Sequence, residues 1–124
     1  MNTEELKRRV ATEIMKWQPV RDMAHGRHYW ATSGEDQGWV CWEGNLPDWS
    51  GDLRSAFDLA RRLGTRGLNL SLVTFAATQH AEAMFLDEDE IATGLRQWGR
   101  ADGDHAMEQA ICLAALLAWK RKGL

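Results

Sequence analysis

LPDWSGDLRSAFDLARRLG, residues 46 to 64, is the most regular stretch of the chain. Its apolar residues recur at the spacings of three and four that mark one face of a helix: Leu53, Ala56, Phe57, Ala60 and Leu63. Charged and polar residues lie on the other face of the predicted helix: Arg54, Ser55, Asp58, Arg61 and Arg62. The pattern predicts a helix over residues 51–63, with Gly64 placed to end it in a left-handed conformation.

Two polar residues at the start of this stretch have structural explanations. Ser50 lies directly before the apolar pattern and is predicted to be the N-cap, because its hydroxyl can accept a backbone N–H of the first turn. Asp52 lies in that turn, where the helix dipole favours a negative charge. The alternative is that Trp49, Ser50 and Asp52 belong to a functional site. The capping interpretation is favoured.

Patterns on either side of the stretch predict the other elements within a single domain, residues 1–124. An apolar stripe predicts a helix over 3–17, and a nearly all-apolar segment predicts a buried helix over 105–122, capped by Asp104. Residues 18 to 36 have no regular pattern apart from one short strand. The predicted strands are 28–31, 38–43, 68–76, 80–86 and 95–101. The fold class is therefore α+β, a three-layer α-β-α sandwich whose small, mostly antiparallel sheet packs against N-terminal, central and C-terminal helices.

Composition excludes several classes of protein. The 124 residues carry a net charge of −3, which has the wrong sign for general nucleic-acid binding. No apolar run approaches the roughly 20 residues of a membrane span, and the polar first residues do not resemble a signal peptide. A cytoplasmic protein is expected. Cys41 and Cys112 are expected to be reduced thiols, mostly buried.

The common catalytic motifs are absent from the sequence. It contains no GxxxxGK[ST] phosphate loop and no GxSxG nucleophile elbow. His25, His28 and Cys41 lack the spacing of a zinc site, so no metal and no cofactor are predicted. An enzyme remains the competing class, because the four histidines at 25, 28, 80 and 105 are able to act as general acids or bases.

Two segments are candidates for binding. If residues 95–101 form a strand, Arg96, Trp98 and Arg100 point to one face, where a tryptophan between two guanidinium groups suits a planar, anionic ligand. The alternative is that Trp98 packs under a helix while the arginines extend into water. The second segment is a loop rich in cations and rings, which is either a binding loop or a solvated surface loop: Arg21, His25, Arg27, His28, Tyr29 and Trp30.

Three sequence motifs resemble the phage ABA sandwich domain family of small bacteriophage and prophage proteins. The matching residues are Met15 and Trp17; Pro47, Trp49, Ser50, Asp52 and Ala56; and Ala110, Ile111, Cys112, Ala114, Ala115 and Leu116. The usual proline at the start of the last helix is replaced around Glu108. The resemblance implies an α-β-α sandwich and a phage origin, and it implies no activity and no catalytic residues.

The leading hypothesis is a phage-encoded, non-enzymatic accessory protein that binds a host factor in the host cytoplasm. Such an anti-defence protein would either block a host defence protein or sequester a nucleotide-like immune signal. A homo-oligomer is compatible with the sequence. The alternatives are a small enzyme that acts on a nucleotide and a structural or assembly protein of the virion.

Overall fold

The computed structural model describes residues 1–34 and 37–124. Within these residues, four α-helices and two antiparallel, three-stranded sheets form a small α+β sandwich, in agreement with the predicted α+β class. The helices are α1 (Thr3–Arg9), α2 (Leu53–Gly64), α3 (Glu88–Thr93) and α4 (Ala106–Lys122). The strands are β1 (Trp17–Asp22), β2 (Arg27–Thr32), β3 (Trp39–Trp42), β4 (Asn69–Phe75), β5 (His80–Leu86) and β6 (Gly99–Asp102).

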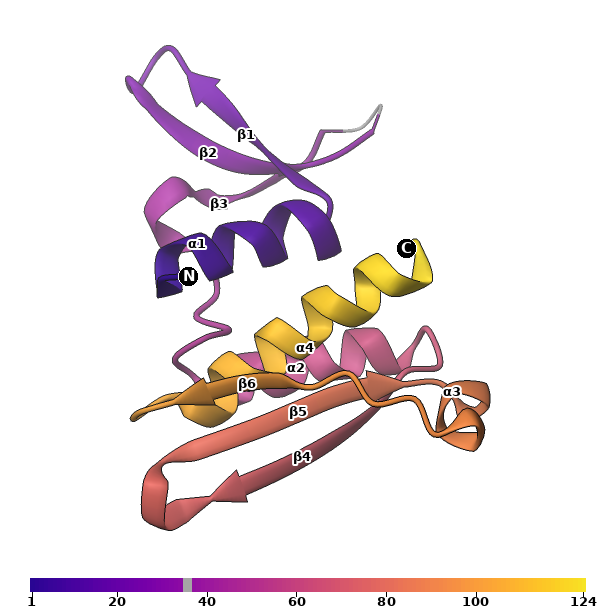
Figure 1. The fold of residues 1–124 in the computed structure, drawn as a ribbon. Helices are drawn as coiled ribbons and strands as arrows, with labels where there is room; N and C mark the ends of the chain where they lie inside the picture. Colours follow the sequence, from indigo (N-terminus) through magenta and orange to yellow (C-terminus); the bar gives the residue numbers. More distant parts are fainter. Residues whose placement is uncertain (35–36) are drawn as a thin grey trace.

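The strands form two sheets, whereas the sequence suggested one. Sheet A has the order β1-β2-β3 and sheet B the order β4-β5-β6. Each sheet is a meander whose strands pair only with their neighbours along the chain, and α2 separates the two meanders in the sequence. Figure 1 shows α1, α2 and α4 lying between the two sheets.

Sheet B packs against α4 through small side chains. Ala81, Ala83 and Ala101 are buried on its inner face, and Ala110 and Ala114 of α4 are buried as well. Strand pairing places Ala83 opposite Gly99 and Ala81 opposite Ala101, so these four residues share one face. The small side chains at these positions let the helix lie close to the sheet.

The first helix is shorter than predicted. α1 ends at Arg9 and continues as a π-helix, η1 (Val10–Ile14), and Lys16 then adopts the left-handed conformation with φ of 59°. Leu6, Val10 and Ile14 are buried as the stripe indicates. Trp17 instead begins β1, where it pairs with Thr32 and its ring lies 5.8 Å from that of Trp49.

Residues 18 to 36 were expected to be irregular apart from a strand at 28–31, but most of them form the hairpin of β1 and β2. Pro19 concealed this hairpin, because proline is rare in strands. β1 lies at the edge of sheet A, where a missing backbone N–H is tolerated. Glu35 and Asp36, in the same predicted segment, lie outside the described residues.

Two predicted helix caps are wrong. Asp52 caps α2, since its side chain accepts the backbone N–H of Ser55, while Ser50 is fully buried two residues earlier. A tight turn from Asp48 to Asp52 fills the predicted first turn, so the helix begins at Leu53 and Ser50 precedes it. Asp104 does not cap α4. His105 occupies the N-cap position without a capping side-chain bond, and Asp104 accepts from Gln79.

The end of α2 also differs from the prediction. Gly64 is the last residue of the helix, and the left-handed glycine is Gly67, with φ of 79°.

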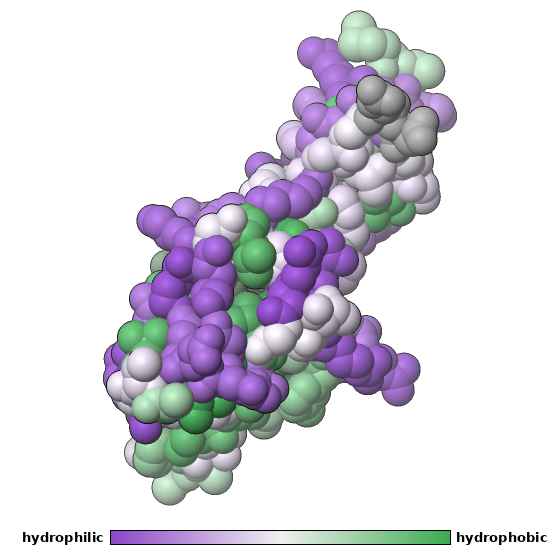
Figure 2. Space-filling model, turned by 90° about the vertical axis from the view of Figure 1, so that its right-hand side faces the viewer, coloured by the Kyte–Doolittle hydropathy of each residue, from purple (hydrophilic) through white to green (hydrophobic). Residues whose placement is uncertain are grey.

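Among the described residues, no helix is long and apolar enough to cross a membrane. Figure 2 shows an elongated molecule with one end projecting from the main body, and with polar and apolar residues mixed over the visible face.

Candidate functional site

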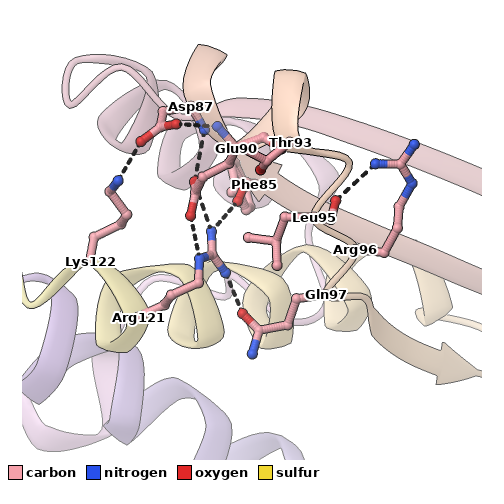
Figure 3. Close-up of polar contacts among 9 residues, drawn as sticks. All are labelled: Phe85, Asp87, Glu90, Thr93, Leu95, Arg96, Gln97, Arg121 and Lys122. Carbon is pink, nitrogen blue, oxygen red and sulfur yellow. Dashed lines mark hydrogen bonds and ion pairs between the residues drawn. The ribbon is translucent and has the colours of Figure 1, made fainter.

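A cluster around Arg121 holds the segment that carries Trp98. From the last turn of α4, Arg121 donates from Nε to Glu90 Oε2 at 2.7 Å and from Nη2 to the Phe85 carbonyl at 2.7 Å. Its Nη1 donates to Oε1 of Gln97, the neighbour of Trp98. The two side chains of the Arg121–Glu90 pair are only 19% and 14% exposed. Figure 3 shows one guanidinium joining α3, the end of β5 and residues 95–97.

α3 is itself fixed by a capping box. The Glu90 backbone N–H donates to Asp87 Oδ1 at 2.8 Å, and the Asp87 N–H donates to Glu90 Oε1 at 3.0 Å. Lys122 forms an ion pair with Asp87. The Arg121 guanidinium lowers the pKa of Glu90, and the Lys122 ammonium lowers the pKa of Asp87. Both carboxylates are therefore charged at neutral pH and clamp α3 to the end of α4.

Beside this cluster lies a cationic groove, which we call the Trp98 groove. The groove has a volume of about 420 Å³. Three elements line it: the end of α1, the start of β6 and one face of α4. The lining residues are Arg9; Trp98, Gly99 and Arg100; and Leu113, Leu116, Leu117 and Lys120. The leucines supply an apolar floor, while three cations and one indole surround it.

Two of the three cations already have acidic partners. Arg9 donates from Nε to Glu13 Oε2 at 2.6 Å, which raises the pKa of Arg9 and lowers that of Glu13. Arg100 donates from Nε to Glu82 Oε1 at 3.1 Å. Lys120 is exposed and forms no ion pair within 4 Å among the described residues, although its charge also contributes to lowering the pKa of Glu13. The groove thus keeps one unpaired ammonium and two guanidinium groups with further N–H donors.

The predicted trio of Arg96, Trp98 and Arg100 is only partly assembled. Strand β6 begins at Gly99, so the alternation argument does not apply to Arg96 and Trp98. The expected strand over 95–101 failed because Arg121 and Gln97 hold residues 95–98 against α4. Trp98 and Arg100 do meet in the groove. Arg96 does not line it, and its Nη1 donates to the carbonyl of adjacent Leu95, away from Arg121 (Figure 3).

Sequence reasoning missed Arg9 and Lys120. Lys120 lies in the predicted helix 105–122 and was not among the predicted binding residues. Its spacing after Leu113, Leu116 and Leu117 places all four on one helix face, which was an available signal. Arg9 had no comparable signal, since only the tertiary fold brings α1 beside α4 (Figure 1).

The second predicted segment forms part of an aromatic surface on the outer side of sheet A. Trp42 is its centre, with the Arg27 guanidinium 3.5 Å from the ring centroid. The rings of His25, Tyr29 and Trp39 lie 5.5, 6.3 and 6.0 Å from that of Trp42. We call these five residues the aromatic face. Trp39 is 59% exposed and gives the face a large solvent-accessible indole.

The other residues of that segment lie elsewhere. Trp30 is buried in the core, which alternation along β2 explains, because Tyr29 and Trp30 point to opposite sides. His28 shares the side of Trp30 and lies 3.7 Å from Glu43, and Arg21 pairs with His28 across the hairpin. His25 is 2.6 Å from Asp22, whose pKa it lowers. Trp39 and Trp42 lie in the predicted strand 38–43 and were not among the predicted binding residues.

His80 is the histidine with the most polar surroundings, on the outer face of sheet B. Its Nδ1 is 2.7 Å from Asp102 Oδ1 and its Nε2 is 3.1 Å from Glu82 Oε1. Glu82 and Asp102 raise the pKa of His80. Both ring nitrogens are thus within hydrogen-bond distance of a carboxylate. A cavity of about 270 Å³ lies beside it, lined in part by Phe75, Asp104 and Glu108.

Metal ligands and thiols do not gather into a site in the described part of the chain. No group of three or more His, Cys, Asp and Glu side chains is arranged to hold a metal ion there. Both cysteines are free. Burial raises the pKa of Cys112 to about 12 and also raises the pKa of Cys41, so neither is an activated nucleophile.

The chain is thus a small α+β protein with a cationic, indole-lined groove. The chain is similar to a solved structure, the crystal structure of a phage protein from Bacillus cereus ATCC 14579. The TM-score is 0.59 and the identity 12%, over 94% of this chain and 90% of that chain, which shows a shared fold. No protein-family profile matches the chain, and no curated protein matches it in sequence.

Proposed function

We propose that this protein is a phage accessory protein that binds an anionic, planar ligand of the nucleotide class in the Trp98 groove. The observation that carries the proposal is the meeting of Trp98 with Arg9, Arg100 and Lys120 above an apolar floor. An indole offers a stacking surface to a base, worth about 1–3 kcal/mol per base. Guanidinium and ammonium groups bind phosphate oxygens through charge-assisted hydrogen bonds.

The size and charge of the groove fit a small ligand. Its volume of about 420 Å³ lies within the usual range of small-molecule sites, about 300–1,000 Å³. Glu13 and Glu82 balance two of the three cations, so the site carries one excess positive charge before a ligand binds. An incoming phosphate would compete with these carboxylates for Arg9 and Arg100 and would meet Lys120 directly.

The biological role that we infer is sequestration of a nucleotide-like immune signal of the host. The similarity in fold to a phage protein and the motif resemblance to the phage ABA sandwich family support a phage origin. No histidine or cysteine lines the groove among the described residues, which suits a protein that retains a ligand better than one that turns it over. The place of action would then be the host cytoplasm.

Calorimetric titration with a panel of nucleoside monophosphates, cyclic nucleotides and cyclic dinucleotides tests the proposal. We expect saturable binding that Lys120→Ala and Arg100→Ala each weaken at least tenfold, about 1.4 kcal/mol. Arg96→Ala is the matched control, because Arg96 is an exposed arginine outside the groove, and it should change Kd less than twofold. Absence of binding, or an equal loss in Arg96→Ala, would refute the groove. Turnover of the nucleotide would favour the enzyme hypothesis.

A second candidate function is the blocking of a host defence protein through the aromatic face. The exposed indole of Trp39, backed by Trp42 and the Arg27 guanidinium, has the composition of a protein-binding hot spot. Trp39→Ala should abolish a specific host-protein complex and leave nucleotide binding unchanged. Phe57→Ala, which removes a partly exposed ring from α2, is the control. Retention of the complex in Trp39→Ala would exclude this surface.

A further inference from the structure

β4 is an open edge of sheet B. It pairs with β5 over all seven of its residues and with no other described strand. No backbone hydrogen bond from a turn, a loop or a helix cap reaches residues 69–75 in the part of the chain that the structure describes. One row of its backbone N–H and C=O groups therefore faces solvent, which is the geometry that recruits another strand.

The other sheet edges carry the protections that natural proteins use against such pairing. β1 contains Pro19 and the charged residues Arg21 and Asp22. β3 has only four residues, and β6 has four, of which Arg100 and Asp102 are charged. β4 reads NLSLVTF, with no charge, no proline and no glycine. It is long, regular and rich in β-branched and apolar residues, so it lacks these protections.

We propose that β4 pairs with β4 of a second copy of this chain, antiparallel about Leu72. In that register Asn69 lies opposite Phe75, Leu70 opposite Thr74, and Ser71 opposite Val73. No charge meets a like charge at any position, which favours a self-complementary interface. The two three-stranded sheets B would join into one sheet of six strands.

The exposed side chains of β4 are consistent with a strand that gains a neighbour. Val73 and Phe75, on the outer face, are 41% and 48% exposed, an unusual exposure for an apolar edge. Leu70 and Leu72, on the inner face, are packed only partly against the core. A neighbouring β4 would cover part of each side chain. A charged peptide partner has no counter-charge on β4, so an identical, neutral strand suits it better.

Sedimentation equilibrium over a concentration series is the test. We expect the wild-type mass to approach twice the 14.1 kDa of one chain and to fall on dilution. Val73→Lys should weaken self-association at least tenfold, because a lysine on an edge strand opposes pairing. Ile91→Lys on α3 introduces the same charge at a residue that is 51% exposed, and it should leave the dimer intact.

Three results would overturn the proposal. They are a single-chain mass for the wild type at every concentration, a dimer that persists in Val73→Lys, and a dimer that Ile91→Lys disrupts equally. Thermal unfolding first establishes that the variants are folded, and Ser71→Lys replaces Val73→Lys if that variant is not. Hydrogen exchange gives an independent measurement: amides of residues 69–75 should exchange more slowly in the dimer than in diluted protein, while those of β1 should not change.

Discussion

Sheets A and B each contain three strands with the same connectivity, yet they attach to the helices by different means. Sheet B approaches α4 so closely that a Cβ on Gly99 would lie 2.5 Å from the Ala114 backbone nitrogen and 2.8 Å from the Ala110 carbonyl. Sheet B and α4 therefore meet backbone to backbone at Gly99, and the side chains around this contact are alanines. A surface of this kind tolerates almost no added volume, because neither backbone is able to move without the whole layer.

Sheet A is attached through large side chains. Trp17 and Trp30 point inward, and Trp17 lies against Trp49, while Trp42 and its neighbouring rings cover the outer side. The indole nitrogen of Trp30 is buried without a described hydrogen-bond partner. Ring packing adapts to small changes more readily than backbone contact does. We therefore expect sheet B with α4 to unfold as one unit and sheet A to open locally at lower free energy.

The strongest test of this difference is Gly99→Val. The added side chain would push β6 off α4, and we expect a loss of at least about 3 kcal/mol, enough to leave much of the protein unfolded. Gly44→Val is the control, because no atom lies within 4 Å of a Cβ at Gly44 and its φ is not positive. Urea denaturation measures both. A Gly99→Val protein as stable as the control would show that β6 moves freely over α4.

Arg121→Ala should have the next largest effect. It leaves Glu90 charged and largely buried and removes the donor to Gln97 and the Phe85 carbonyl, a loss of about 3 kcal/mol. Arg96→Ala, an exposed arginine on the same segment, should cost less than about 0.5 kcal/mol. Because Arg121 positions the segment before Trp98, nucleotide binding should weaken as well. Equal stability of the two variants would contradict the role of the cluster.

The sequence predicted the region around sheet B well because its patterns are local. The alternation of Leu70 and Leu72 and the nearly all-apolar α4 follow directly from burial. The last strand was misplaced, since it depends on Arg121 reaching across from another element, and helix α3 (Glu88–Thr93) was not predicted. Sheet A was predicted poorly because Pro19 suggested a break and the edge position of β1 is a property of the fold. The candidate site shows the same limit: Trp98 and Arg100 were found, whereas Arg9 comes from a distant helix.

Two substitutions near the start of α2, the helix that separates the two sheets in the sequence, should change the free energy of unfolding in opposite directions. Asp52→Ala removes the N-cap of α2 and should cost about 0.5–2 kcal/mol. Ser50→Ala should be neutral or stabilising by up to about 1 kcal/mol, because the Ser50 hydroxyl is buried without a described hydrogen-bond partner. Thermal unfolding of both variants separates the two roles. If Ser50→Ala were less stable than Asp52→Ala, the Ser50 hydroxyl would contribute to the stability of the fold, contrary to this expectation.

A smaller effect is expected on the outer side of sheet A. Arg27→Ala removes the guanidinium above Trp42 and should cost about 0.5–1 kcal/mol. The loss should appear in hydrogen exchange as faster opening of residues 17–32, with sheet B unchanged. Arg61→Ala on α2 is the control, because Arg61 is 80% exposed and stacks on no ring among the described residues. Equal acceleration of exchange in β5 would show that the two sheets open together and would remove the contrast between them.

The smallest expected effect is a pH dependence of the free energy of unfolding. It arises from side-chain contacts on the outer face of sheet B. Glu82 and Asp102 raise the pKa of His80 in the folded protein. The stabilisation from a raised pKa is complete below the unfolded value of about 6.5 and is lost as pH rises through the folded value. His80→Gln should therefore be less stable than the wild type at pH 6, and the difference should shrink by pH 8.5.

Lower pH is avoided, because His80 lowers the pKa of Glu82 and protonation of that carboxylate would break the same pair. Urea denaturation at the two pH values gives the difference, and an NMR titration of the His80 ring gives the pKa itself. A stability difference that is constant between pH 6 and 8.5 would mean that His80 contributes by packing against Phe75, whose ring lies 5.6 Å away, and not by charge.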